Sequence, residues 1–361
     1  MIRSFDAASA APSMAVRSAF GRRAALLAVA LGVMALSTGA SPTKAPAPLT
    51  LAGSTDFPGY TGDFDHFAID ARDQRLFLAG EESAEIEVLD LRSGRLIRRI
   101  KGYGAPHSLL VMPGRGELLV IDGEKTSPVL DAATLKVKRS YALPKGADSA
   151  GYDRSTGHLW VVTGGKDVPQ KDSNLIEIDP VTGKTIKSVH FDADHVEAMA
   201  IEQSGPNLYI NVTDKNVLAV VDKASGKIVR QIPIKEAEQN APIAIDETNH
   251  RLFVVTRKPG KLLVLNADTG ATIASFVAPA RTDEVVWDAA NRRVYVAGGQ
   301  GYISVVEQDD PDHYREAARI PSMAGAKTAV LDNAANRLWV AASPGESKAM
   351  GKVLRFDVAH R

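Results

Sequence analysis

Ionisable side chains occupy the same position in six of seven short apolar segments of the chain. The position lies five residues before the end of each segment. It is occupied by Asp65, His107, Asp148, Glu197, Ala241, Asp283 and Lys327. The following position adds His66 and Glu284. Charged groups are rare in apolar strands, so a repeated set of them indicates a polar site.

If these side chains meet, their types suit ion binding or acid–base catalysis. Carboxylates favour Ca²⁺ or Mg²⁺, whereas an added imidazole favours a transition metal. The candidate metal ligands are Asp65, Asp148, Glu197 and Asp283. Alternatively Asp148 or Glu197, crowded by like charges, would have a raised pKa and act as a general base, with Lys327 stabilising a developing anion. The candidate catalytic residues are Glu197, His107 and His66.

The structural alternative is that each carboxylate only accepts hydrogen bonds from backbone N–H groups of neighbouring loops. Which reading holds depends on the elements that position these residues. The sequence describes those elements through an internal repeat.

The repeat is clearest in the stretch 243–270, which contains three apolar runs separated by polar turns. Short aliphatic and β-branched runs between Gly, Pro, Asn and Asp clusters predict antiparallel strands. The first run of each copy ends at Asp70, Met112, Asp153, Glu202, Asp246, Asp288 and Asp332. These ends are 41 to 49 residues apart, which is the period of a four-stranded propeller blade.

Seven copies need seven outer strands, but the last copy ends at Arg361 just after its third strand. The segment 49–54 precedes the first copy and can supply the missing strand. This closure would also remove open sheet edges. The sequence therefore predicts an all-β protein: one seven-bladed β-propeller domain over residues 49–361, with four-stranded antiparallel blades.

The repeats resemble the YVTN-repeat, or YncE-like, family of bacterial propellers, whose repeats are WD40-like. Tyr295-Val296-Ala297-Gly298 is an imperfect form of the family's second-strand signature, and Thr182-Gly183-Lys184 matches its closing turn. The resemblance covers residues 49–361. It implies a fold whose members include extracytoplasmic binding proteins, lactonases and redox-enzyme subunits, with DNA binding in some relatives.

The N-terminal residues predict export. Arg22 and Arg23 precede an apolar run that is too short to span a bilayer, and small residues follow it. This is the pattern of a signal peptide over residues 1–40, with Met14 as an alternative start. Residues 41–48 form a Pro/Ala tether. We expect a periplasmic monomer with no membrane span after signal cleavage; the absence of cysteine excludes a lipoprotein anchor.

Two long loops carry lysines toward the same face as the ring residues. They cover residues 163–173 and 342–352. With the loop of the fifth copy, they predict a basic rim that would suit an anionic ligand, or else simply solvated loop tips. The rim candidates are Lys166, Arg257, Lys258 and Lys348.

Several cofactors and partners are disfavoured. Without cysteine there is no CxxCH motif and no c-type haem. Ile186, Ile228 and Ile273 stand where quinoprotein propellers carry a docking Trp, which argues against pyrroloquinoline quinone. The zero formal net charge argues against a broad nucleic-acid surface.

The function predicted from the sequence is an exported binding or scaffold module with a polar ligand site at the channel mouth. Its ligand would be a small molecule or a protein, with a divalent cation as a possible cofactor. Two alternatives stay open: a metal-assisted hydrolase of the lactonase type, and a protein-interaction propeller without a small ligand, or a weak nucleic-acid binder.

Overall fold

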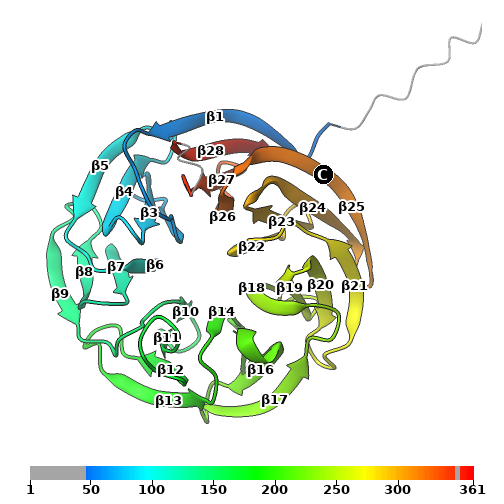
Figure 1. The fold of residues 1–361 in the computed structure, drawn as a ribbon, viewed down its shortest axis with the longest axis horizontal. Helices are drawn as coiled ribbons and strands as arrows, with labels where there is room; N and C mark the ends of the chain where they lie inside the picture. The colour runs from blue at the N-terminus through cyan, green and yellow to red at the C-terminus, as the bar shows by residue number, and fades with distance from the viewer. Residues whose placement is uncertain (1–45, 346–349) are drawn as a thin grey trace, which may run out of the picture. The chain divides into compact units, whose positions relative to one another are not determined.

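The computed structural model describes residues 46–345 and 350–361. The residues from Pro46 onward form one compact unit. It contains seven four-stranded antiparallel sheets arranged as blades around a central channel (Figure 1), which confirms the predicted propeller. Within the described residues, no helix has the length and apolar character needed to cross a membrane. The signal-peptide prediction and Lys348 lie outside the described residues.

The first four blades follow one another along the chain, each running from the channel outward. Blade 1 contains β2 (Phe67–Asp70), β3 (Arg75–Gly80), β4 (Glu85–Asp90) and β5 (Leu96–Lys101). Blade 2 contains β6 (Pro106–Met112), β7 (Glu117–Asp122), β8 (Ser127–Asp131) and β9 (Val137–Tyr141). Blade 3 contains β10 (Ala150–Asp153), β11 (His158–Gly164), β12 (Ser173–Ile178) and β13 (Thr185–Phe191). Blade 4 contains β14 (Val196–Ile201), β15 (Asn207–Val212), the 3₁₀ turn η1 (Thr213–Lys215), β16 (Val217–Asp222) and β17 (Lys227–Pro233).

The last three blades complete the ring. Blade 5 contains β18 (Glu238–Asp246), β19 (Arg251–Lys258), β20 (Gly260–Asn266) and β21 (Thr272–Val277). Blade 6 contains β22 (Glu284–Asp288), β23 (Arg293–Gly298), β24 (Gln300–Asp310) and β25 (His313–Ala324). Blade 7 contains β26 (Ala326–Asp332), β27 (Arg337–Ala342), β28 (Gly351–Val358) and, outermost, β1 (Leu49–Phe57).

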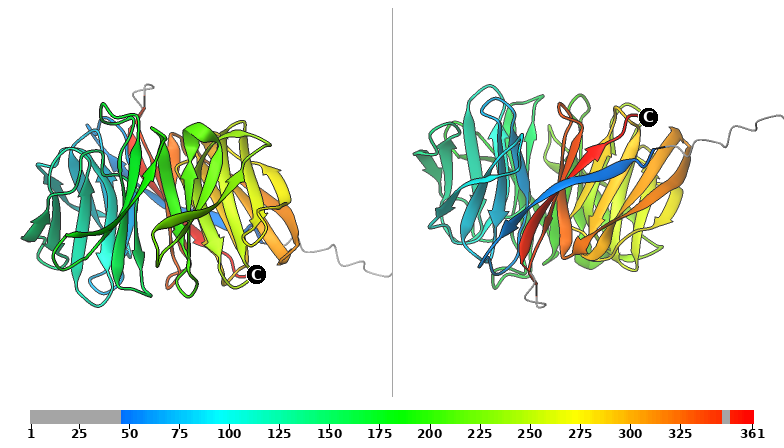
Figure 2. Two further views of the ribbon diagram at one scale, coloured as in Figure 1. Left: turned by 90° about the horizontal axis from the view of Figure 1, so that it is seen from below. Right: turned by 90° about the horizontal axis from the view of Figure 1, so that it is seen from above.

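The N-terminal strand closes the ring as predicted. β1 pairs antiparallel with β28, from Leu49 opposite Val358 to Phe57 opposite Gly351, and Figure 2 shows the two strands side by side. The strand is three residues longer than the predicted segment 49–54. It continues because Phe57 is fully buried, with its ring 5.5 Å from that of Phe64.

The hydrophobic core lies between adjacent blades. The second strand of each blade is buried on both faces, which explains its nearly continuous apolar sequence. Its aromatic slot is filled by Phe77, Trp160, Tyr209, Phe253, Tyr295 and Trp339, each at most 1% exposed. One core cluster joins Trp160 of blade 3 to Leu208 of blade 4, so each blade is stabilised by its neighbour.

The acidic residues at the strand ends stabilise the turns that follow them by accepting hydrogen bonds. The Oδ1 atom of Asp70 accepts hydrogen bonds from the N–H groups of Arg72 (3.1 Å) and Asp73 (3.2 Å). In the closing turn, Asp90 accepts from the N–H (2.8 Å) and hydroxyl (2.6 Å) of Ser93, before Gly94 at φ 75°. Short acidic side chains and glycine favour such turns. These repeated acids are structural, unlike the ring residues at the other end of the inner strands.

Candidate functional site

The ring residues lie where the innermost strands β2, β6, β10, β14, β18, β22 and β26 begin (Figure 1). The backbone there is bulged. The N–H of Asp65 donates to the Ala79 carbonyl (2.9 Å), and the Ala79 N–H donates to the His66 carbonyl (3.0 Å). Asp65 and His66 therefore both pair with Ala79, which is a β-bulge, so both of their side chains can point toward the channel.

The same irregularity recurs around the ring. Asp148 and Ser149 both bond to Val162 in the same two-to-one manner. The pairing of the inner strand also shifts at the ring position in blades 2, 4, 5 and 7. Bulges are a common way to aim side chains at a site.

The ring residues converge on a cavity of about 340 Å³ at the channel mouth. All six ionisable residues predicted at the first ring position line it, together with His66, Lys166 and Arg257. Glu284 lies deeper, where its Oε2 atom is 3.2 Å from Nδ1 of His66. Lys258 is exposed and is not among the lining residues.

Arg257 takes the place left by Ala241, the one ring position without a charge. It lies at the end of β19, and its guanidinium contacts Glu197 Oε1 (3.2 Å) and Asp283 Oδ1 (2.6 Å). Lys327 completes this side of the cavity, with its Nζ atom 2.5 Å from Asp283 Oδ2. The predicted rim residue Arg257 is thus a bridge between two ring acids.

Glu197 is held as an anion. Burial alone would raise its pKa, but a hydrogen bond from His195 (2.5 Å) and the charge of Arg257 lower the pKa to about 2. For Lys327, burial alone would lower the pKa, but the charges of Asp283 and Asp63 raise it above its ordinary value. These groups are charged and paired at neutral pH.

We expect the variant Arg257→Met to raise the pKa of Glu197 from about 2 toward or above its ordinary 4.5, because burial then acts with less opposition. Carbon-13 NMR of the Glu197 carboxyl as a function of pH measures this shift. Lys258→Met is the matched control, since it removes an exposed cation from the next residue. A Glu197 pKa that stays near 2 in Arg257→Met would contradict the assigned role of Arg257.

The opposite side of the cavity carries excess negative charge. Nδ1 of His107 lies 2.9 Å from Asp65 Oδ2, 3.7 Å from Asp148 Oδ1 and 3.9 Å from Glu81 Oε1. We call these four residues the acidic cluster. His107 is only 6% exposed. Asp65 has a second cationic neighbour, because Nε2 of His66 lies 3.4 Å from its Oδ1 atom, whereas Asp148 and Glu81 have only His107 as an ion-pair partner among the described residues.

Burial and neighbouring charges shift the pKa values of the acidic cluster. Burial, opposed by His107 and reinforced by Asp65, raises the pKa of Asp148 to about 6. Burial and the charge of Asp65 raise the pKa of Glu81 to about 7. Burial alone would lower the pKa of His107, yet Asp148 and Asp65 raise it to about 10. Asp65 differs: although burial acts in the other direction, His66, His107 and Lys327 hold its pKa well below the ordinary value, so the acids with raised pKa values are Asp148 and Glu81.

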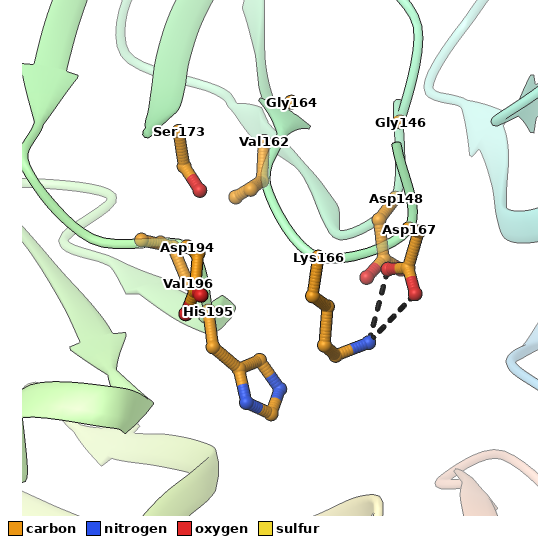
Figure 3. A pocket seen from close by; sticks show the side chains of 10 residues that line it. All are labelled: Gly146, Asp148, Val162, Gly164, Lys166, Asp167, Ser173, Asp194, His195 and Val196. Carbon is orange, nitrogen blue, oxygen red and sulfur yellow. Dashed lines mark hydrogen bonds and ion pairs between the residues drawn. The ribbon is translucent and has the colours of Figure 1, made fainter. Parts of the chain in front are cut away.

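Two carboxyl groups of the cluster lack a hydrogen-bond donor. Asp65 is bonded to His107, but no side chain or backbone group of the described residues donates to the carboxyls of Asp148 or Glu81. Figure 3 shows Lys166 close to Asp148, with its ammonium bonded instead to Asp167 (2.9 and 3.0 Å). Asp148 and Glu81 are therefore free to accept from a ligand.

Three of these groups have the spacing of metal ligands. One donor atom each from Asp65, His107 and Asp148 lies within 4.8 Å of the other two. Two of the four metal candidates predicted from the sequence belong to this set. The other two, Glu197 and Asp283, are engaged by Arg257.

The sequence reasoning missed Glu81, Asp63, His195 and Arg281 as neighbours of the site. The same gap-free alignment of the repeats could have identified Glu81. It stands eleven residues after Asp70, just as Arg257 stands eleven residues after Asp246. That position lies at the end of the second strand of the blade. The loop that follows this strand lies at the channel mouth. His195 and Asp63 precede ring residues by two and carried no repeat signal.

The fold and this cavity define a seven-bladed β-propeller with a charged channel mouth. No protein-family model matches the chain, and no curated protein sequence matches it. The structure is similar to a propeller chain in "Crystal Structure of Mitotic Checkpoint Complex", with a TM-score of 0.70 and 15% identity over 93% of this chain and 99% of that chain. At this identity the similarity shows the fold alone, and the resemblance to the YVTN-repeat family stays a prediction.

Proposed function

We propose that the protein is a binding module whose ligand presents a cationic group to Asp148 and Glu81 at the channel mouth. The observation that carries this proposal is that these two carboxyls accept no hydrogen bond from the described residues. Asp65, Glu197 and Asp283 line the same cavity, but Asp65 is bonded to His107 and the other two are paired with Arg257. The side chains of Asp148 and Glu81 are 20% and 34% exposed, so a ligand cation can reach them and supply charge-assisted hydrogen bonds.

The charge distribution favours a cation over the anion that a basic rim would suit. Three cations of the cavity are already engaged: Lys166 by Asp167, Arg257 by Glu197 and Asp283, and Lys327 by Asp63 and Asp283. An anion at any of these three cations would have to displace such a pair, whereas Arg281, exposed and also lining the cavity, forms no ion pair within the described residues. A cation entering the acidic cluster would instead relieve repulsion among its carboxyls.

The pKa values argue against the catalytic residues predicted from the sequence, Glu197, His107 and His66, whereas Asp148 and Glu81, with pKa values of about 6 and 7, are in the range that suits a general base. A general base needs a pKa near the working pH, whereas the pKa of Glu197 is about 2. The charges of Asp65 and Glu284 raise the pKa of His66 well above its ordinary value, although burial acts in the other direction. With the pKa of His107 at about 10, both imidazoles hold their protons at neutral pH.

Metal-assisted hydrolysis is a second candidate, favoured by the spacing of Asp65, His107 and Asp148. An imidazole with two carboxylates is a ligand set for Zn²⁺ or Mn²⁺. Elemental analysis of purified protein tests it, together with the melting temperature before and after treatment with a chelator. Bound metal and a chelator-induced decrease would support this function; no metal and no change would exclude it.

Binding of a cation should strengthen as the pH rises. Asp148 and Glu81 lose protons near pH 6 and 7, and only their ionised forms attract the ligand. We therefore expect the affinity for ethylammonium, a minimal probe, to rise at least about tenfold from pH 5 to pH 8, since at pH 5 about a tenth of Asp148 and about a hundredth of Glu81 is ionised. The charged groups facing Asp148 and Glu81 are Asp63, Asp65, His66, His107, Lys166, Asp167, Glu197, Arg257, Arg281, Asp283 and Lys327.

NMR titration at several pH values measures this dependence. Acetate, a probe of similar size and opposite charge, is the control and should bind more weakly throughout. An affinity for ethylammonium that is independent of pH, or lower than that for acetate, would contradict the proposed function.

Export to the periplasm is proposed from residues 1–40, which lie outside the described residues. A chain that begins after residue 40 in the exported fraction of its native cells would support it. An uncleaved chain in the cytoplasm would contradict it.

A further inference from the structure

A second chamber of about 180 Å³ lies deeper in the channel. Its lining residues come just after the ring positions in the sequence, along the innermost strands. Seven of its eleven lining residues are apolar: Phe67, Leu109, Leu110, Ala150, Ala198, Met199 and Ile243. Its polar members are His66, Ser108, Ser149 and Glu284, the residues nearest the ring. Accessible apolar walls of this kind are typical of ligand sites.

The two chambers share lining residues and are therefore adjacent. His66 and Ala198 line both the mouth cavity and the lower chamber. His66 pairs with Glu284 on the side of blades 1 and 6, while Ala198 lies on β14, across the channel (Figure 1). The small methyl group of Ala198 therefore borders the passage on the side away from the ion pair.

We infer that the ligand is an amphiphilic amine, with its ammonium group at Asp148 and Glu81 and an unbranched hydrocarbon tail that passes Ala198 into the lower chamber. This inference rests on the proposed function and adds the class of ligand. The polar cavity above and the apolar chamber below match a head group and a tail in the same order. An amine without a tail would leave the apolar walls in contact with water.

The chamber volume sets the length of the tail. The chamber has a volume of about 180 Å³, so its walls limit the tail to a short chain. Each buried methylene should strengthen binding about fourfold. We therefore expect affinity to rise from ethylammonium to about hexylammonium and then to level off.

Calorimetric titration of the full chain with ethyl-, butyl-, hexyl- and octylammonium tests this inference, with hexanol as the uncharged control. Ala198→Leu should abolish the gain with chain length, while Met199→Ala should move the optimum to a longer chain by enlarging the chamber. Ala289→Leu adds the same atoms at an exposed turn and should behave as wild type.

The outcomes separate the two proposals. A fourfold gain per methylene that is lost in Ala198→Leu supports the inference. Ethylammonium binding without any gain for longer chains overturns it and leaves the proposed function intact. Absence of binding for every amine, or hexanol binding as tightly as hexylammonium, overturns both. If Ala198→Leu does not fold, a Met199→Ala optimum unchanged from wild type still overturns the inference.

Discussion

Asp148→Asn should weaken the binding of ethylammonium by about 100-fold at pH 8. The substitution keeps the size of the side chain but removes one of the two carboxylates that lack donors in the acidic cluster. Truncating one partner of a buried charge pair costs about 2–5 kcal/mol, and 100-fold corresponds to about 2.7 kcal/mol. Asp148 is the better choice than Asp65, because Asp65 also bonds to His107.

NMR titration or calorimetry measures this loss, and circular dichroism checks the fold. Asp192→Asn is the matched control, since it removes the same charge from an exposed residue outside the cavity. Its affinity for ethylammonium should stay within twofold of wild type. Equal affinities for Asp148→Asn and Asp192→Asn would show that the ligand binds elsewhere.

Lys223→Met should lower the free energy of unfolding by about 3 kcal/mol, as breaking a buried ion pair leaves an uncompensated charge. Lys223 is 6% exposed. Its Nζ atom lies 3.2 Å from Asp153 Oδ2 and donates to the Glu202 carbonyl (2.5 Å). These contacts join blade 3 to blade 4 on the face opposite the channel mouth, so the variant tests how the blades are held together.

Urea unfolding measures this change. Lys227→Met is the control, because Lys227 is exposed in the same blade, and it should change stability by less than about 0.5 kcal/mol. The double variant Lys223→Met/Asp153→Asn should lose less than the sum of the single variants, because it removes both charges. A Lys223→Met protein as stable as wild type would contradict the role of this ion pair.

The fold could be predicted because the repeat encodes it redundantly. Each copy places an apolar pair at a fixed distance from its first strand end, so errors in one copy are corrected by the others. Closure by the N-terminal strand followed from counting strands. Its extension to Phe57 did not, since the burial of Phe57 depends on Phe64 in the connection to blade 1.

The candidate site could be predicted only in part. Counting from the strand ends placed six ionisable residues on one cavity, but it did not reveal the bulges, since backbone irregularity leaves no repeat signal at these positions. The pairing of charges was also hidden. Arg257 and Glu197 lie 60 residues apart and meet only across neighbouring blades. Such contacts between blades determine which carboxyls receive no hydrogen bond from the protein.

The most direct test of the central claim is a crystal structure of the protein with hexylammonium bound at pH 8. The account predicts the ammonium nitrogen within hydrogen-bonding distance of the carboxyls of Asp148 and Glu81, and the hydrocarbon tail beside Ala198. A ligand bound outside the channel, or an ammonium group that contacts neither carboxyl, would contradict the account.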